Sequence, residues 1–396
     1  MPSPPECYTA ARGPEQISAS CLSYATNAHA PCFIGCRFRR PVLAIDSPGF
    51  PAKPLVGLLA LGFMRAMVLE RPRAAEEAPL QAREIPQPTP GPGQIRVRVR
   101  VCGVCHTDLH IVQGELPMHK LPVVPGHQVV GVVDAVGAGA KGFQEGDRAG
   151  VIWLHSTDGS CEYCRRNSEN LCINAKFTGY DVNGGYTEAV IVPADFAYPI
   201  PKGFSDENAA PLLCAGVIGY RSLKVSGASQ SDRLGFYGFG ASAHIVLQLA
   251  RHMGCEVYVF TRAAAHRELA TKLGAGWVGD AKERPPHELD AAIVFAPAGP
   301  IVLDALRALR KGGTVALAGI TMTPIPEMDY SLIYHERVVR SVANSTRQDA
   351  RELLQLAAEV PVRTEVTLYP LEEANRAIAD MKHSRVEGAA VLRVSQ

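Results

Sequence analysis

The sequence predicts an α/β protein of two domains, in which a β-rich domain precedes a doubly wound parallel sheet. Three observations support this prediction. Short strand patterns separated by glycine and proline run from Met64 to about residue 200, which is typical of a β-barrel-like domain. From about residue 212, strands alternate with helical stretches, as in a parallel sheet covered by helices. A glycine-rich turn, Gly238-Phe-Gly240-Ala-Ser-Ala243, follows one of these strands and opens a helix.

The length of 396 residues exceeds one compact core and predicts two domains plus an extension. We expect a disordered extension at 1–63, the β-rich domain at 64–211, the parallel-sheet domain at 212–344 and a return to the first domain at 345–396. Prolines interrupt every periodic pattern in the extension, so it cannot bury enough apolar surface to offset its ordering entropy. Arginine is only weakly enriched there, and acidic residues are present. This composition favours a translation start assigned too far upstream over a transit segment.

Individual elements follow from periodicity. Residues 94–101 alternate with period two, and residues 129–136 are nearly all apolar, which predicts a strand buried on both faces. In the second domain we expect strands at 234–237, 256–260, 290–295 and 314–318, with helices that end at His252, Leu273 and Leu309. The last part of the chain predicts helical stretches at 351–359 and 371–381 and a final strand at 389–394.

Composition excludes several classes of partner. The formal net charge is +1 and there is no long basic run, which argues against nucleic acid and membrane surfaces. No apolar run approaches the eighteen or so residues of a membrane span. The expected partner is therefore a small molecule. Eleven cysteines, five of them at metal-motif positions, indicate a reducing compartment, and we expect a cytoplasmic protein.

Cysteine and histidine recur with metal-ligand spacing. The segment Cys102-Gly-Val-Cys105-His106-Thr107-Asp108-Leu109-His110 is followed by Pro125-Gly126-His127 and by Cys161-x2-Cys164-x7-Cys172. A lone cysteine such as Cys102 is more often a small buried apolar residue. Three thiols within twelve positions, among charged residues, are more typical of tetrahedral zinc. The sequence therefore predicts a metalloprotein.

These segments, in this order and with Leu-Cys-Ala-Gly at 213–216 and the glycine turn at 238–243, resemble the zinc-dependent alcohol dehydrogenases of the medium-chain dehydrogenase/reductase superfamily. The resemblance extends from Met64 to the C-terminus and is greatest to a less studied bacterial-type branch. It implies a GroES-like catalytic domain, a Rossmann cofactor domain and a C-terminal segment that folds back onto the catalytic domain. Relatives form dimers or tetramers through sheet edges of the cofactor domain, so a homodimer or homotetramer is expected.

The glycine turn predicts a dinucleotide site. Gly238 would make the tight turn, Gly240 would let the backbone approach the pyrophosphate, and Ala243 would pack the helix on the strand. The next strand ends at Thr261 and Arg262, with no acid to bind the ribose 2′-hydroxyl of NAD. A hydroxyl and a guanidinium suit a 2′-phosphate, so we expect NADP(H) to be preferred over NAD(H). The alternative is that Arg262 is a solvated loop charge. By resemblance, His106 stands where relatives often place a phosphate-binding residue.

The resemblance also implies a catalytic zinc held by Cys105, His127 and Cys214, with a fourth position open for water or substrate oxygen. Zinc lowers the pKa of a bound hydroxyl from about 16 toward 7, after which hydride can leave the carbon for the nicotinamide ring. Thr107 would accept the substrate's hydrogen bond and His110 would pass the proton toward solvent. Asp108 would accept a hydrogen bond from the His127 ring and fix its tautomer.

Several positions depart from the family pattern. Asp158 stands where relatives normally place the first of four structural cysteines. A site of Asp158, Cys161, Cys164 and Cys172 is still chemically acceptable for zinc, which makes two zinc ions per chain. Gln128 replaces a common glutamate, and Ile218 replaces a threonine that many relatives place near the nicotinamide. Trp153 and Leu154 are equally compatible with a substrate pocket and with plain core.

The leading hypothesis is a zinc-dependent, NADP(H)-preferring oxidoreductase that interconverts an alcohol with its aldehyde or ketone. One alternative is a metal-free quinone or enoyl reductase of the same superfamily, although that enzyme has no need of Cys105, His127 and Cys214. Another is a catalytically idle nucleotide-binding protein, which Gln128 and Ile218 leave open. The physiological substrate is not implied by the resemblance.

Overall fold

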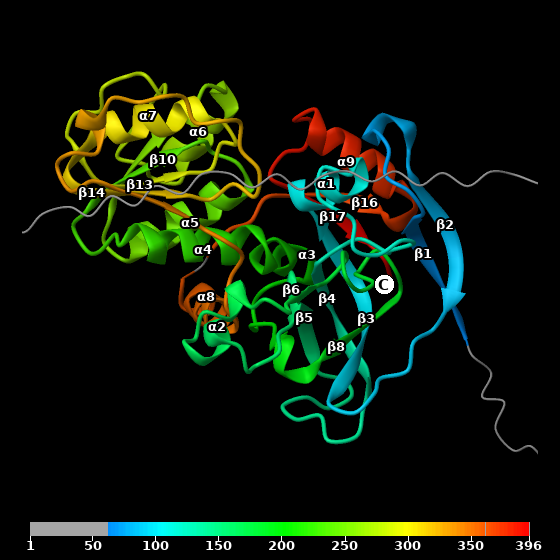
Figure 1. Ribbon diagram of the computed structural model, residues 1–396. Helices are drawn as coiled ribbons and strands as arrows, with labels where there is room; N and C mark the ends of the chain where they lie inside the picture. The colour runs from blue at the N-terminus through cyan, green and yellow to red at the C-terminus, as the bar shows by residue number, and fades with distance from the viewer. Residues whose placement is uncertain (1–61, 361, 396) are drawn as a thin grey trace, which may run out of the picture. The chain divides into compact units, whose positions relative to one another are not determined.

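The computed structural model describes residues 62–360 and 362–395. The predicted extension lies outside these residues except for positions 62 and 63, so its disorder stays a prediction. The described chain is built on two large sheets (Figure 1), one of seven strands and one of six. The predicted combination of a GroES-like β-rich part and a parallel Rossmann sheet is confirmed.

The seven-stranded sheet has the order β16-β17-β3-β4-β5-β9, with β8 also paired to β3. The central strands β3 (Gln94–Val104) and β4 (Gln128–Val136) are antiparallel. The first six residues of β4 are buried, which agrees with the prediction for residues 129–133. Asp134 and Ala135 are only half-buried and Val136 is exposed, so the predicted burial on both faces does not extend to residue 136. From the C-terminal part of the chain, β17 pairs antiparallel with β3, which places the last residues in the same sheet as the cysteine motif. The other strands are β5 (Arg148–Val151), β8 (Ala189–Pro193), β9 (Ala197–Pro199), β16 (Val366–Pro370) and β17 (Ala389–Arg393).

Two small ribbons flank this sheet. β1 (Phe63–Leu69) pairs with β2 (Leu80–Pro86), and β6 (Leu154–Ser156) pairs with β7 (Lys176–Phe177). Between β6 and β7 lies what we call the cysteine lobe, residues 158–172, which contains α2 (Glu162–Arg165) and a 3₁₀ turn at Glu169–Leu171.

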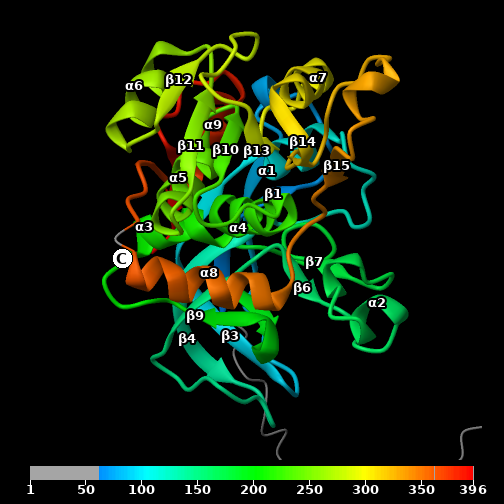
Figure 2. The ribbon, with the colours of Figure 1, turned by 90° about the vertical axis from the view of Figure 1, so that its left-hand side faces the viewer.

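The six-stranded sheet is parallel throughout, with the order β12-β11-β10-β13-β14-β15 (Figure 2). Alternate side chains along its strands enter two separate hydrophobic clusters, one on each face. Helices α4 and α5 pack into one cluster and α7 into the other, on opposite sides of the sheet in Figure 1. The strands are β10 (Arg233–Tyr237), β11 (Glu256–Phe260), β12 (Trp277–Gly279), β13 (Leu289–Val294), β14 (Leu309–Leu317) and β15 (Val338–Ser341). The helices are α4 (Ala215–Ser226), α5 (Ala241–His252), α6 (Ala264–Lys272) and α7 (Gly299–Ala308).

Most predicted elements are found, with shifted boundaries. β14 starts at Leu309, five residues before the predicted strand, because Leu309 pairs with Leu289 ahead of an irregularity in the register. α8 (Arg347–Glu359) begins four residues early because Thr346 and Asp349 form a capping box. α9 (Ala374–Lys382) follows a 3₁₀ turn at Leu371–Glu373.

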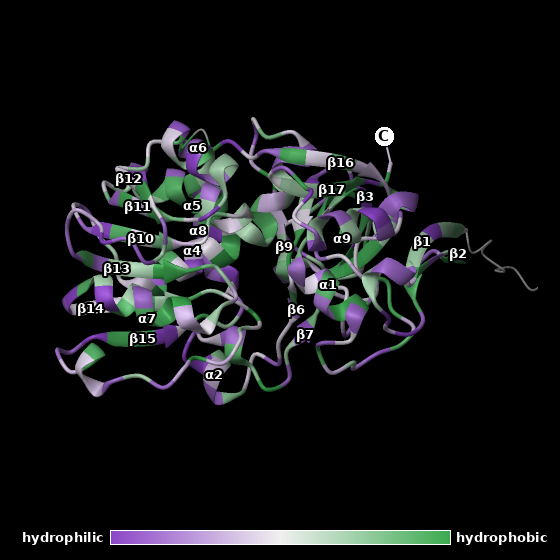
Figure 3. Cartoon of the chain, turned by 90° about the horizontal axis from the view of Figure 1, so that it is seen from above, coloured by the Kyte–Doolittle hydropathy of each residue, from purple (hydrophilic) through white to green (hydrophobic). Residues whose placement is uncertain are grey.

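Hydrophobic residues gather along the strands and on the helix faces that cover them (Figure 3). Among the described residues, no helix has the length and apolar character needed to cross a membrane.

Candidate metal centre and cofactor site

The first turn of α1 (His106–Gln113) places three of the predicted site residues. Cys105 is the N-cap of this helix, and its Sγ accepts a hydrogen bond from the Thr107 backbone N–H at 3.4 Å. The Asp108 carboxylate accepts one from the Cys105 N–H at 3.0 Å. This capping box fixes Cys105 at the end of β3 and buries Asp108 completely.

His127 is placed by a glycine at the entrance to β4. Gly126 has a φ of +97°, and a Cβ there would come within 2.4 Å of the Tyr186 ring, so only glycine fits this approach. The His127 ring is fully buried, and its Nδ1 lies 3.2 Å from Asp108 Oδ1. The two groups attract each other at this ion-pair distance, although Nδ1 has no well-aligned hydrogen-bond acceptor among the described residues.

Cys105, His127 and Cys214 come together from three separate segments. Cys105 Sγ is 3.2 Å from His127 Nε2 and 3.8 Å from Cys214 Sγ, and all three ligand atoms lie within 4.8 Å of one another. Zinc bonds of about 2.3 Å to sulfur and 2.0 Å to nitrogen, in a tetrahedron, put two sulfurs about 3.8 Å apart and sulfur and nitrogen about 3.5 Å apart. The donor set therefore fits zinc.

The trio is electrostatically coupled. The hydrogen bond from Cys214 and the nearby His127 ring lower the pKa of the Cys105 thiol, and that same hydrogen bond, with burial, raises the pKa of Cys214. Burial acts to lower the pKa of His127, but Asp108 and Cys105 together raise it to about 10. A metal that binds here must displace protons from these groups.

The second predicted donor set also comes together. One ligand atom from each of Asp158, Cys161, Cys164 and Cys172 lies within the same 4.8 Å limit. The Asp158 carboxylate already accepts hydrogen bonds from the Ser160 and Cys161 backbone N–H groups and from the Asn174 side chain, each at 2.8 Å. These donors lower its pKa and keep it ionised, as a metal ligand must be.

The predicted proton path from Thr107 to His110 is only partly connected in the structure. His110, one turn after Thr107 on α1, contacts Glu115 through Nδ1 and lies 3.3 Å from Thr321 Oγ1 through Nε2. No hydrogen bond joins Thr107 to His110 in the described structure. His106 is exposed at the start of α1. Glu115 and Thr321 were not predicted: an acid five residues after His110 was a possible signal, whereas Thr321 comes from a distant loop.

The positions that depart from the family pattern have distinct environments. Gln128 is buried against Gly103, where a Cβ would lie 2.8 Å from its Oε1. Ile218, on α4, is half-buried. Leu154 is fully buried core, whereas Trp153 is half-buried with its ring centroid 5.0 Å from that of His127 and 5.0 Å from that of Phe177. Of the two residues, only Trp153 stands beside the metal trio.

The glycine turn lies at the carboxyl end of β10, as predicted. Gly238 has a φ of +96°, and a Cβ there would come within 2.9 Å of the Ala296 backbone nitrogen. At Gly240, by contrast, a Cβ would meet nothing within 4 Å, which leaves open space at the start of α5. Ala243 is completely buried in the cluster between α5 and the sheet. This arrangement suits a pyrophosphate at a helix N-terminus.

The neighbouring strand end carries Thr261 and Arg262. Thr261 is buried, and its backbone pairs with Gly279. Its carbonyl oxygen accepts a hydrogen bond from Arg267 Nε at 2.8 Å. Arg267 therefore stabilises this turn, and its role was not predictable from the sequence because the contact depends on how α6 folds back onto the end of β11. Arg262 is exposed.

A glycine turn at the edge of a parallel sheet, together with a Cys₂His donor set that fits zinc, defines a class: metal-containing, nicotinamide-dependent oxidoreductases. Two families match the sequence. The "Alcohol dehydrogenase GroES-like domain" matches residues 91–202, and "Zinc-binding dehydrogenase" matches residues 243–359.

Individual relatives of the chain support the same family assignment. The chain is 49% identical over 335 residues to a protein described as "Probable alcohol dehydrogenase AdhA" of Mycobacterium tuberculosis, covering 83% of this chain and 97% of that protein. It is 37% identical over 342 residues to an "Alcohol dehydrogenase" of Geobacillus stearothermophilus, covering 84% and 100%. A solved cinnamyl alcohol dehydrogenase from Sorghum bicolor superposes with a TM-score of 0.76 at 27% identity, over 84% of this chain and 98% of that one. The chain belongs to the zinc-type alcohol dehydrogenase family of the medium-chain dehydrogenase/reductase superfamily.

Proposed function

We propose that this NAD(P)-dependent alcohol dehydrogenase uses zinc and prefers NADP(H), and that it interconverts a primary or secondary alcohol with its aldehyde or ketone. The observation that carries the proposal is the trio of Cys105, His127 and Cys214, whose Sγ–Nε2 and Sγ–Sγ separations of 3.2 and 3.8 Å match a tetrahedral zinc site. A metal-free quinone or enoyl reductase has no use for such a set of donors.

When bound, zinc would polarise the substrate oxygen and the nicotinamide would exchange hydride with its carbon. The chain's own residues then have separate tasks. Cys105, His127 and Cys214 would hold the metal, and Asp108 would orient the His127 ring through the 3.2 Å contact at Nδ1. The Trp153 ring, edge-on to His127, would exclude water from one side.

Thr107 and His110 would handle the proton. Thr107, in the first turn of α1, would accept the hydrogen bond from the substrate hydroxyl. His110, one turn further along, would take the proton, and its contact with the half-exposed Glu115 side chain offers an exit to solvent.

Two features support NADP(H) over NAD(H). The turn after β11 has Thr261 and Arg262 and no acid in that position. Arg262 is exposed and so accessible to a phosphate. An acid at this point would repel a 2′-phosphate, whereas a guanidinium pairs with it.

We also propose that the expected homodimer or homotetramer forms through β15. This strand is the last in its sheet, and all four of its residues are exposed. Two of the four, Val338 and Val339, are apolar, and the segment before the strand also exposes Ile325, Tyr330 and Tyr334. An unpaired edge with exposed apolar side chains is a site for strand addition, and the same strand of a second copy is a self-complementary occupant about a two-fold axis.

The test is zinc per chain, by elemental analysis of full-length protein purified without added metal. We expect two zinc ions, one of which is lost in Cys214→Ser and the other in Cys164→Ser. A panel of alcohols and aldehydes, assayed with NADPH and NADP⁺, should then show turnover in the wild type and a loss of several orders of magnitude in Cys214→Ser.

Protein without zinc would contradict the proposal and direct the search to quinones and enones. Protein that binds NADPH and zinc but turns over no alcohol or carbonyl compound would instead favour the idle nucleotide-binding protein, for which Gln128 and Ile218 are the relevant departures.

A further inference from the structure

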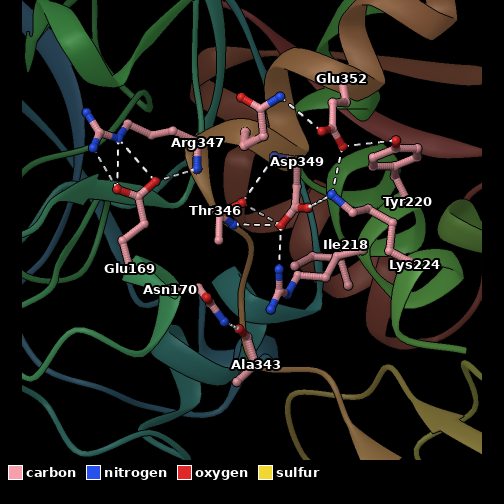
Figure 4. Close-up of polar contacts among 12 residues, drawn as sticks. Glu169, Asn170, Ile218, Tyr220, Lys224, Ala343, Thr346, Arg347, Asp349 and Glu352 are labelled. Carbon is pink, nitrogen blue, oxygen red and sulfur yellow. Dashed lines mark hydrogen bonds and ion pairs between the residues drawn. The ribbon is translucent and has the colours of Figure 1, made fainter. Parts of the chain in front are cut away.

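The stretch of the cysteine lobe that ends at Cys172 is anchored to the start of α8 (Figure 4). Glu169 accepts hydrogen bonds from the Arg347 backbone N–H at 2.8 Å and from Arg347 Nη2 at 2.7 Å. Asn170 Nδ2 donates to the carbonyl oxygen of Ala343 at 2.8 Å. Glu169, Asn170 and Cys172 are buried, so water competes only weakly for these contacts. The Sγ of Cys172, a predicted metal ligand, therefore has a fixed position in the fold.

Asp158, the fourth predicted ligand of the lobe, needs more orientation than the cysteine that it replaces. A cysteine side chain has one torsion angle before a single sulfur, whereas an aspartate has a second torsion angle and two oxygens. One Asp158 oxygen lies within 4.8 Å of all three lobe sulfurs. The backbone is already tied to the anchored stretch, because the Asp158 N–H donates to Cys172 Sγ at 3.5 Å. The carboxylate still has to be held so that one oxygen faces the thiols.

The two oxygens of Asp158 have different partners. Oδ1 accepts hydrogen bonds from the Ser160 and Cys161 backbone N–H groups, each at 2.8 Å. Oδ2 accepts one hydrogen bond, from Asn174 Nδ2, also at 2.8 Å. A carboxylate oxygen has roughly two lone pairs, so Oδ1 is fully engaged and Oδ2 keeps one lone pair free. Oδ2 is therefore the oxygen that can still bind a metal.

Asn174 reaches this oxygen from the anchored stretch, since it follows Cys172 by two residues. A thiolate in the place of Asp158 would have a single acceptor atom, which the backbone N–H groups of the turn can serve. The donor from Asn174 is therefore useful to a carboxylate in particular. Side chains that orient a metal ligand in this way typically change metal affinity by about 10- to 100-fold.

We propose that Asn174 is a positioning residue of the lobe metal site, which holds Asp158 Oδ2 toward Cys161, Cys164 and Cys172 so that the carboxylate completes the ligand set in place of a fourth thiolate. This inference rests on the proposed function, because it requires that the lobe bind the second zinc ion.

The test measures how fast the lobe loses zinc to a chromophoric chelator. It uses full-length Cys214→Ser protein, in which the lobe zinc is the one expected to remain. Asn174→Ala removes the amide, and Asn174→Leu removes it while keeping nearly the same size; each should speed zinc release about tenfold. Ile173→Ala is the matched control, because Ile173 is the exposed neighbour of Asn174 and makes no hydrogen bond to Asp158 through its side chain. It should leave the rate unchanged.

The same substitutions are then repeated together with Asp158→Cys, which supplies four thiolates, an ordinary ligand set for structural zinc. There, Asn174→Ala and Asn174→Leu should leave the release rate unchanged, since a single sulfur offers no second acceptor to the amide.

Equal acceleration with and without Asp158→Cys, acceleration by Asn174→Ala but not by Asn174→Leu, or no acceleration at all would overturn the inference and leave the proposed function standing. Cys214→Ser protein without zinc would overturn the inference together with the second zinc ion, while zinc in the wild type would still support the catalytic site. Wild-type protein without any zinc would overturn both the inference and the proposed function.

Discussion

At the scale of single residues, the proposed preference for NADP(H) depends on Arg262. Arg262→Ala should raise the KM for NADPH about tenfold and leave the KM for NADH nearly unchanged, because only NADPH carries the 2′-phosphate that the guanidinium would pair with. Steady-state kinetics with both cofactors measures this. Arg284, exposed in the same sheet domain, serves as the control, and Arg284→Ala should leave both KM values unchanged. Equal losses for NADPH and NADH in Arg262→Ala would mean that Arg262 is only a surface charge.

Tyr237 carries a polar atom that the fold does not use. It is completely buried and stacked on Phe260 at 4.1 Å, and its hydroxyl has no hydrogen-bond partner within the described chain. Tyr237→Phe removes this cost and should leave the free energy of unfolding unchanged or raise it by about 1 kcal/mol, as urea denaturation would measure. Tyr220→Phe should lower it by about 1 kcal/mol, because the Tyr220 hydroxyl donates to Glu352 at 3.1 Å. A clear loss of stability in Tyr237→Phe would contradict this account.

The candidate site was predictable where sequence spacing alone places residues together. Cys161, Cys164 and Cys172 share one short loop, and their spacing alone predicts a metal site. Cys105, His127 and Cys214 were assigned as ligands by resemblance to a family, as were the roles of Thr107 and Asp108. Glu115, Thr321 and Arg267 were missed, because their contacts depend on how loops far apart in the chain fold against one another.

At the scale of elements, the ion pairs between α4 and α8 depend on Asp349. Burial acts to raise the pKa of this carboxyl, but hydrogen bonds from the Thr346 backbone, Arg221 and Lys224 lower it overall. A carboxyl whose pKa is lower in the folded state contributes stability above its unfolded pKa of about 3.9, and that contribution is lost as the pH falls through the folded value.

Asp349→Asn should therefore cost about 3 kcal/mol of unfolding free energy at pH 7, since it removes the buried charge that pairs with half-buried Arg221 and with Lys224. The same variant should lose less stability than the wild type when the pH falls below about 4. Denaturation at several pH values measures both effects. Asp304→Asn is the control, because Asp304 pairs with the exposed side chain of Arg307. Parallel pH profiles for Asp349→Asn and the wild type would contradict the assignment.

Element boundaries show where local pattern fails. α5 ends at His252 as predicted, because its apolar period stops there. The start of α8 was missed because Thr346 and Asp349 cap a turn that is otherwise polar. β15 was not predicted, since its four exposed residues carry no pattern of burial.

At the scale of the whole molecule, the proposed dimer gives a direct prediction. Light scattering coupled to gel filtration should give at least twice the chain mass of 42.5 kDa, and Val338→Lys should shift the protein toward the monomer. Leu368→Lys places the same charge on β16, the edge of the other large sheet, and should not change the mass. A monomeric wild type, or equal effects of the two substitutions, would exclude this interface.

The fold class was predictable from the order of strand and helix patterns, which shows where β-rich sequence gives way to alternating strands and helices. The pairing of β17 with β3, across nearly three hundred residues, was expected only through the family resemblance, because no local pattern encodes such a contact.

The chain has two tryptophans, one beside the metal trio and one in the cofactor sheet. Trp153 lies 5.0 Å from the ring of His127, and Trp277 lies 5.0 Å from the ring of Phe260 in the cofactor sheet. These two rings are natural fluorescent reporters: we expect the emission of Trp153 to respond to what occupies the metal trio, and that of Trp277 to respond to nucleotide binding. Replacing either one with phenylalanine isolates the signal of the other, so the two halves can be followed separately without an added label.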